Sequence, residues 1–355
     1  MFDRPDEGMA DPTLPPERED SVNQPQEPAP NAAANKGGPG KVLAAVVGLS
    51  IAVCLMLLAF AAPAVNSGPH DIPLAVTGPQ DAVAQVSATL EKNLPGAFDV
   101  TTQPSQGEVR TAIAERDAVG GLAFGPDGVT VLTASGAGAP YTQLLHNVGA
   151  QIAATGAQVS YVDLAPMTSD DPAGSGLSVI ALPLVFGGMA SAVLFSVLQR
   201  HRRGLRLAGA VAVAIVSGLA VTAILQFWLG SFDGNYWLTA AYVALGMAAI
   251  SLTMLGLESW VGLPGLGLGA LAMLFIANPL SGMATGWQWL PSPWGAIGQY
   301  LPVGATGTAV RSAVYFDGNG VGSAGLVLVG WGVLGLVLLA LPSSRLRSRS
   351  HAVPS

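Results

Sequence analysis

Charged residues are scarce in this chain, and their scarcity excludes an ordinary soluble protein of this size. They make up 10% of the 355 residues, whereas half of the residues are hydrophobic. Soluble domains usually carry about a quarter charged residues. Between residues 207 and 342 the only charged side chains are those of Asp233, Glu258, Arg311 and Asp317. A stretch this long and this apolar requires a lipid bilayer as its solvent.

Cysteine is almost absent, which excludes an internal disulfide. The single residue, Cys54, lies in an apolar segment, where we expect it to behave as a small hydrophobic side chain, and no Cys/His spacing fits a zinc site. The chain also lacks the G-x-x-x-x-G-K-[ST], H-E-x-x-H and G-x-S-x-G motifs. We therefore expect no ATPase site of its own, no cofactor, no bound metal and no enzyme activity. A net charge of −7 without a large basic patch argues against nucleic-acid binding.

The N-terminal region combines a polar tail with a first apolar segment. Residues 1–40 are rich in Pro, Glu, Asp, Asn and Ala, which predicts a disordered tail. Residues 41–64 contain an uncharged run long enough to span a bilayer. A cleaved signal peptide is the alternative, because the small residues Ala62 and Ala64 flank Pro63 near a cleavage point. The long polar leader favours an uncleaved membrane anchor.

Residues 65–176 alternate strand-like and helical patterns. Strands are expected at residues 72–76, 98–102, 119–124, 129–133 and 159–164, and helices at residues 80–93, 105–116 and 141–155. Ser105 and Glu108 have the spacing of a capping box, and residues 125–128 predict a turn. This order predicts a compact α/β domain. In the linker that ends it, we expect Asp170 and Asp171 to be solvated, with a cation site as the alternative.

Five more apolar segments follow within residues 177–342. They cover residues 177–198, 207–229, 237–257, 263–280 and 323–341. The predicted fold class is therefore a membrane all-α bundle of about six transmembrane helices, with an extracytoplasmic α/β domain inserted between helices 1 and 2. The glycines of residues 262–269 and of the last segment predict close helix packing.

Residues 281–322, between the fifth and sixth segments, are rich in Trp, Tyr and Pro, as is typical of a membrane interface. We expect two short helices that enter the bilayer and return, a re-entrant hairpin, with a soluble loop as the alternative. One of them is expected at residues 305–316, followed by a turn. The candidate gate residues of this segment are Trp287, Trp294, Pro302, Arg311 and Asp317.

Two isolated charges have competing interpretations. Arg311 is costly near a bilayer, which points to a gate or to a contact with outer-leaflet lipid headgroups. The alternative is an interfacial arginine whose long side chain reaches water. We expect Glu258 to be solvated at a cytoplasmic helix end.

Basic residues cluster beside the apolar segments and predict the orientation of the chain. Lys36 and Lys41 precede the first segment. The candidate partner-docking cluster lies between the second and third segments, and a basic tail at residues 343–355 follows the last. With six spans these groups share one side, which the positive-inside rule assigns to the cytoplasm. We therefore expect a multi-pass protein of the plasma membrane with both termini cytoplasmic.

The docking cluster consists of Arg200, Arg202, Arg203 and Arg206. It is either a topology determinant beside anionic membrane lipids or a docking surface for a cytoplasmic partner.

The layout resembles the type-2 ABC exporter permeases, and within them the branch that includes the phage infection protein family. The resemblance covers roughly residues 42–342. It is carried by Leu290-Pro291-Ser292-Pro293-Trp294-Gly295, by Tyr300-Leu301-Pro302, and by Arg311 with Tyr315-Phe316-Asp317-Gly318.

This resemblance implies a homodimeric half-transporter that works with a separate ATP-binding subunit. It also implies outer re-entrant helices in residues 281–322 and a link at residues 199–206 that faces the ATPase. Many such permeases have an amphipathic helix before the first span, and residues 1–40 show none.

Two functions therefore compete. The first is a permease subunit that moves a lipid or another hydrophobic molecule outward. The alternative is a membrane-anchored surface binding or scaffold protein that uses the extracytoplasmic domain. No pair of catalytic residues lies within the predicted spans, which disfavours an intramembrane enzyme.

Overall fold

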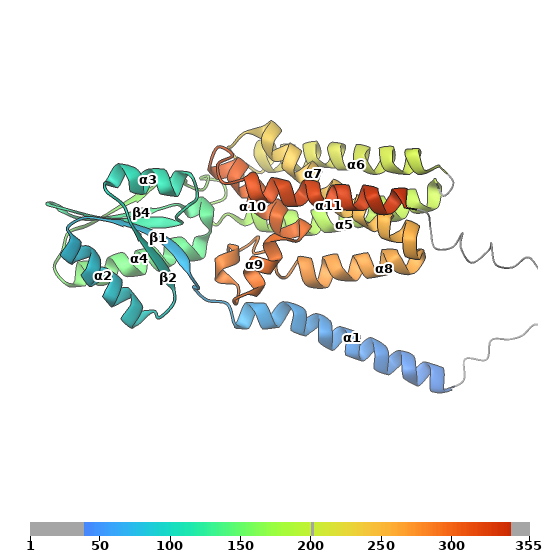
Figure 1. The fold of residues 1–355 in the computed structure, drawn as a ribbon, viewed down its shortest axis with the longest axis horizontal. Helices are drawn as coiled ribbons and strands as arrows, with labels where there is room; N and C mark the ends of the chain where they lie inside the picture. Colours follow the sequence, from blue (N-terminus) through green and yellow to red (C-terminus); the bar gives the residue numbers. More distant parts are fainter. Residues whose placement is uncertain (1–38, 200–201, 342–355) are drawn as a thin grey trace, which may run out of the picture. The chain divides into compact units, whose positions relative to one another are not determined.

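The computed structural model describes residues 39–199 and 202–341 (Figure 1). The predictions for residues 1–38, for Arg200 and for the tail at residues 343–355 lie outside the described residues. Helix α1, Pro39–Val65, has 27 residues, none of them buried. A helix that is apolar on all sides is typical of a membrane span.

The α/β domain contains one mixed five-stranded sheet. Its strands are β1 (Ile72–Thr77), β2 (Phe98–Thr102), β3 (Gly120–Gly125), β4 (Gly128–Thr133) and β5 (Val159–Asp163). They lie in the order β2-β1-β3-β4-β5, and only β3 and β4 are antiparallel neighbours. That pair is joined by the predicted turn, where Gly128 has a φ of +125°. The predicted succession of strands and helices is confirmed.

Three helices cover the two faces of this sheet. They are α2 (Gln80–Asn93), α3 (Gln106–Ala114) and α4 (Ala139–Ala154). Helices α2 and α4 lie on one face and α3 on the other (Figure 1). The hydroxyl of Ser105 accepts a hydrogen bond from the backbone N–H of Glu108 at 3.3 Å, so the predicted cap of α3 is present.

Five helices are long and apolar enough to cross a membrane, which indicates a multi-pass membrane protein. They are α1, α5 (Ser175–Leu198), α6 with its π-helical extension η2 (Arg203–Ala223 and Ile224–Trp228), α7 (Tyr236–Val261) and α11 (Gly322–Ala340). The prediction of about six spans is therefore corrected to five within the described residues.

The predicted fifth span is a shorter helix. It consists of α8 (Leu263–Ala272) and the π-helical turn η3 (Met273–Ala277). Together they are about 22 Å long, whereas the hydrocarbon core is about 30 Å thick. The helix ends early because Pro279 has no N–H to donate, and Gly282 then takes a left-handed conformation with a φ of +64°.

Helix α7 lies at the centre of the bundle and packs against α5, α6, α8, α10 and α11. The prediction of close packing at glycines holds at Gly335 of α11, where a Cβ atom would collide with the backbone of Leu252. It does not hold at Gly330 or Gly332, where a Cβ atom would meet open space.

The segment at residues 281–322 contains two short helices, α9 (Trp294–Gln299) and α10 (Pro302–Tyr315), after a 3-10 turn, η4 (Trp287–Trp289). Helix α10 covers the short helix predicted around Arg311. Nearly all of its residues are buried, and it packs against α5, α7, α9 and α11. At about 21 Å it is too short to cross a bilayer, and it is not an open loop.

Candidate functional site

The α/β domain contacts helix α10 through Arg116, which follows α3. The Nη1 atom of Arg116 donates to the carbonyl oxygen of Thr308 at 3.0 Å and to the hydroxyl of Ser312. The guanidinium also lies over the ring of Phe316, 5.2 Å from its centroid. One arginine therefore ties the sheet domain to the buried short helix.

The backbone of Arg116 is held in a conformation that glycine usually occupies. Its φ is +67°, and its N–H donates to the carbonyl of Ile113 at the end of α3. A residue other than glycine in the left-handed backbone conformation destabilises the folded state by about 1 kcal/mol. Such a residue persists where its surroundings determine it, which here means the contacts of its side chain with α10.

Tyr141, in the first turn of α4, makes a second contact between the α/β domain and residues 281–322. The Tyr141 hydroxyl donates to Oε1 of Gln288 at 2.8 Å, and its ring meets Trp289 edge-on at 5.7 Å. Burial raises the pKa of Tyr141 to about 12, although the charge of Arg311 acts in the opposite direction. The phenol is therefore a neutral hydrogen-bond donor at physiological pH.

Arg311, on α10, is only 3% exposed. Its Nη2 atom donates to the carbonyl oxygen of Met283 at 2.8 Å, and its Nε atom has no partner among the described residues. The prediction that this side chain reaches water is therefore wrong. Small residues along α10 let the helix pack closely, and that packing encloses the guanidinium.

Arg116 and Arg311 line the same cavity, of about 360 Å³, together with Tyr141, Gln288 and Phe316. Burial, and next the charge of Arg311, lower the pKa of Arg116 to about 10, so Arg116 is a cation at pH 7. Arginine side chains such as that of Arg311 stay protonated in proteins. Among residues 39–199 and 202–341 the one ion pair within 4.0 Å joins two other residues, so neither cation has a carboxylate partner. We call this cavity the two-arginine pocket.

Two acidic residues also line this pocket. Glu115 and Asp117 contribute to the lining, and both are exposed to solvent. They flank Arg116 in the sequence without forming an ion pair with it in the described structure. Apart from these two exposed carboxylates, the pocket is lined by cations and by neutral groups.

The structure brings only some of the predicted gate residues together. Trp287 lines the two-arginine pocket with Arg311, and Pro302 is buried at the first turn of α10. Trp294 is exposed and lies outside that lining. Asp317 is exposed, in a turn with a φ of +52°.

The structure also places the arginines of the predicted docking cluster in different environments. Arg206 is buried and forms an ion pair with Glu258 of α7, so Glu258 is not the solvated helix end that we expected. Arg203 donates to the carbonyl oxygen of Leu339 at 3.2 Å. Arg202 is exposed, and Arg200 lies outside the described residues. Among the described residues, the prediction of a docking surface therefore narrows to Arg202 and Arg203, and for Arg200 it stays a prediction.

Asp171 corrects a second expectation, because it is 5% exposed rather than solvated. Its Oδ1 atom accepts from the N–H of Ser175 at 2.9 Å and from the Ser175 hydroxyl at 2.7 Å, and Oδ2 accepts from the N–H of Gly176 at 2.6 Å. The carboxylate therefore caps the start of α5 and complements its dipole. Burial alone would raise the pKa of Asp171, but the hydrogen bonds outweigh it and lower the pKa.

Replacing Asp171 with alanine is expected to lower the free energy of unfolding by about 2 kcal/mol, because two backbone N–H groups lose a charged acceptor. Since the pKa is lower in the folded state, the stabilisation is full above the ordinary aspartate pKa, near 3.9, and disappears as pH falls through the folded value. Thermal unfolding in detergent at pH 3 to 7 measures both effects. Asp170→Ala is the control. Equal losses in both variants would contradict the capping role.

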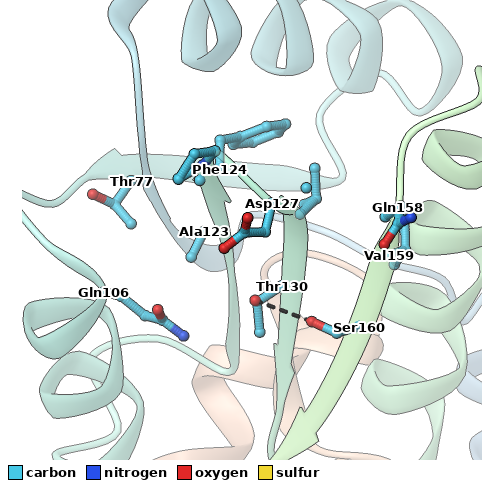
Figure 2. Close-up of a pocket in the computed structure, with 13 residues that line it drawn as sticks. Thr77, Gln106, Ala123, Phe124, Asp127, Thr130, Gln158, Val159 and Ser160 are labelled. Atoms are coloured by element: carbon cyan, nitrogen blue, oxygen red, sulfur yellow. Dashed lines mark hydrogen bonds between the residues drawn. The ribbon is translucent and has the colours of Figure 1, made fainter.

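A second pocket, of about 480 Å³, lies at the far end of the sheet around the turn between β3 and β4 (Figure 2). Figure 2 shows the hydroxyls of Thr130 and Ser160 bonded to each other across two strands, at 3.1 Å. The one carboxylate in its lining belongs to the exposed turn residue Asp127. This second pocket has no buried charged group in its lining, which makes it the weaker candidate for a functional site.

Sequence reasoning singled out Arg311 and Trp287 but missed Arg116 and Tyr141. Arg116 appeared only as the last residue of a predicted helix, and Tyr141 as the first of another. For Arg116, the available signal in the sequence is the absence of a glycine. No glycine follows α3 at the position that usually takes a left-handed conformation.

No family model, no curated protein and no solved structure matches this chain.

Proposed function

We propose that this chain is the membrane permease subunit of an export system resembling the type-2 ABC exporters. It moves a lipid or another hydrophobic molecule outward, as a homodimer, with a separate ATPase subunit. The observation that carries this proposal is helix α10, which is buried among long apolar helices and tied to the α/β domain by Arg116. A short helix inside a bundle is suited to open and close a path, because it does not need to cross the bilayer.

In this proposal the α/β domain lies outside the cell and the link around Arg202 lies in the cytoplasm. Helix α5 connects these two regions, because it begins just after Asp171 and ends at Leu198. Its 24 residues are about 36 Å long. Movement imposed on the link by an ATPase would reach the α/β domain through α5, and α10 through the central helix α7.

The distribution of buried charge favours an ATP-driven over an ion-driven exporter. Ion-coupled transporters use carboxylates or histidines within their spans as ion sites. In the described part of the five long helices, Glu258 is the only acidic residue, and it is paired with Arg206. The nucleotide-hydrolysing function would then belong to another chain, because this sequence has no phosphate-binding loop.

Affinity purification of the full-length protein from its native membrane, followed by mass spectrometry, tests this proposal. We expect an ATPase subunit in a stoichiometric amount, and a smaller amount with the exposed variant Arg202→Glu. Arg110→Glu, an exposed charge reversal on α3 of the α/β domain, is the matched control and should retain the subunit. Recovery of envelope proteins alone, or of nothing, would contradict the proposal.

A surface binding or scaffold protein is the second candidate, and one observation favours it. A groove of about 500 Å³ lies between α2 and α4 on the face of the sheet away from α3, and apolar side chains form much of its lining. On this alternative the α/β domain carries the function and the helices anchor it. If activity survives deletion of the domain in otherwise intact protein, this alternative is excluded.

A further inference from the structure

We propose that the two-arginine pocket binds a phosphate-bearing anion, which completes the charge balance between Arg116 and Arg311. This inference goes beyond the proposed function. It concerns binding by the chain alone, needs no ATPase, and therefore stands or fails separately from export.

The first step of the argument is the cost of the two charges. Arg311 is almost fully buried, and Arg116 lines the same cavity, so two like charges lie at one cavity. The two carboxylates of that cavity, Glu115 and Asp117, are exposed and pair with neither arginine. A buried guanidinium is normally paired with a carboxylate, because desolvation is expensive. No carboxylate of the described residues lies within 4.0 Å of either group. An anion in the cavity would remove both the repulsion and part of the desolvation cost.

The second step is the supply of donors. Arg311 has a buried Nε atom without a partner among the described residues, and most N–H groups of both guanidiniums remain available after their protein contacts. The planar guanidinium fork fits two oxygens of one phosphate. Arg116 keeps its charge at physiological pH despite its lowered pKa of about 10.

The third step is the shape of the site. A cavity of about 360 Å³ falls in the range of small-molecule pockets, about 300–1,000 Å³. The rings of Trp287 and Phe316 line it beside the charges, so it offers apolar contacts next to the anion site. Such a lining accepts either a free phosphate or the headgroup of an anionic phospholipid.

The test uses the purified full-length protein in a non-ionic detergent. Its thermal unfolding midpoint and its affinity by calorimetry are measured with inorganic phosphate, with soluble dihexanoyl-phosphatidylglycerol, and with dihexanoyl-phosphatidylcholine. The last is the control for net charge, because its phosphate is neutralised by the choline cation. We expect the midpoint to rise with phosphate, with phosphatidylglycerol, or with both, and not with phosphatidylcholine. A rise with phosphatidylglycerol alone identifies the source as a lipid headgroup, and a rise with phosphate alone identifies a free anion.

Variants locate the binding. Arg116→Gln is expected to weaken binding by about tenfold or more, because a charged hydrogen-bond donor is lost. Arg110→Gln, an exposed arginine on the preceding helix, is the matched control and should bind like the wild type. The wild-type titration tests the proposal even if Arg116→Gln does not fold. No shift of the wild-type midpoint with either anion, or equal losses in the two variants, would overturn the proposal.

Discussion

Replacing Glu258 with glutamine is expected to lower the free energy of unfolding by about 3–5 kcal/mol, because it leaves the cation of Arg206 buried without a partner. The helix dipoles do not add to this loss, because a negative charge is unfavourable at a helix C-terminus and a positive charge at an N-terminus. Arg206 lies in the first turn of α6 and Glu258 in the last turn of α7. The expected loss therefore comes from the unpaired guanidinium. Denaturant unfolding in detergent micelles measures the effect.

The double variant Arg206→Met with Glu258→Leu separates the contribution of the ion pair from the cost of leaving one buried charge unpaired. Removing both charges should restore most of the lost stability, because no buried charge remains. The exposed variant Arg202→Gln should stay within about 0.5 kcal/mol of the wild type. If Glu258→Gln behaves like Arg202→Gln, the pair is not buried as described.

Replacing Tyr141 with alanine is expected to cost about 3–5 kcal/mol, because a fully buried aromatic ring leaves a cavity. The loss falls where α4 meets Gln288 and Trp289, so the α/β domain should also separate from residues 281–322 more readily. Calorimetry of the full-length protein should then show two unfolding transitions in place of one.

Two further variants define this effect. Tyr141→Phe keeps the ring and loses one hydrogen bond, so we expect a cost of about 1–2 kcal/mol. Tyr161→Ala removes an exposed tyrosine of the same domain and should cost less than about 1 kcal/mol. Equal costs for Tyr141→Ala and Tyr161→Ala would show that the domain does not depend on this contact.

The sequence predicted local structure well where one physical signal dominates. The strands and helices of the α/β domain follow from alternating and helical periodicity and from turn residues such as Gly125 to Gly128. Four of the five later apolar segments form helices long enough to cross a bilayer. The exception, residues 263–277, is apolar enough but too short, and hydropathy alone does not set where a helix ends.

Long-range contacts could not be predicted in the same way. Nothing near Glu258 in the sequence indicates Arg206, and nothing near Arg116 indicates Ser312, because both pairs depend on how helices pack. The same reason explains the error at Asp171. From the sequence, a carboxylate in a polar linker is expected to be solvated. Only the folded structure shows that the start of α5 lies against it. Of the residues that line the two-arginine pocket, only Arg311 and Trp287 were therefore predicted as site residues from the sequence.

The proposed export function requires the α/β domain to lie outside the cell, and cysteine labelling measures on which side of the membrane it lies. Cys54 is the only cysteine, so Cys54→Ala gives a background without thiols. Gln85→Cys and Arg202→Cys then each place one exposed thiol, on α2 and on the link before α6. We predict that a membrane-impermeant maleimide labels Gln85→Cys in intact cells and Arg202→Cys only after permeabilisation. The reverse pattern would contradict outward export with a cytoplasmic ATPase.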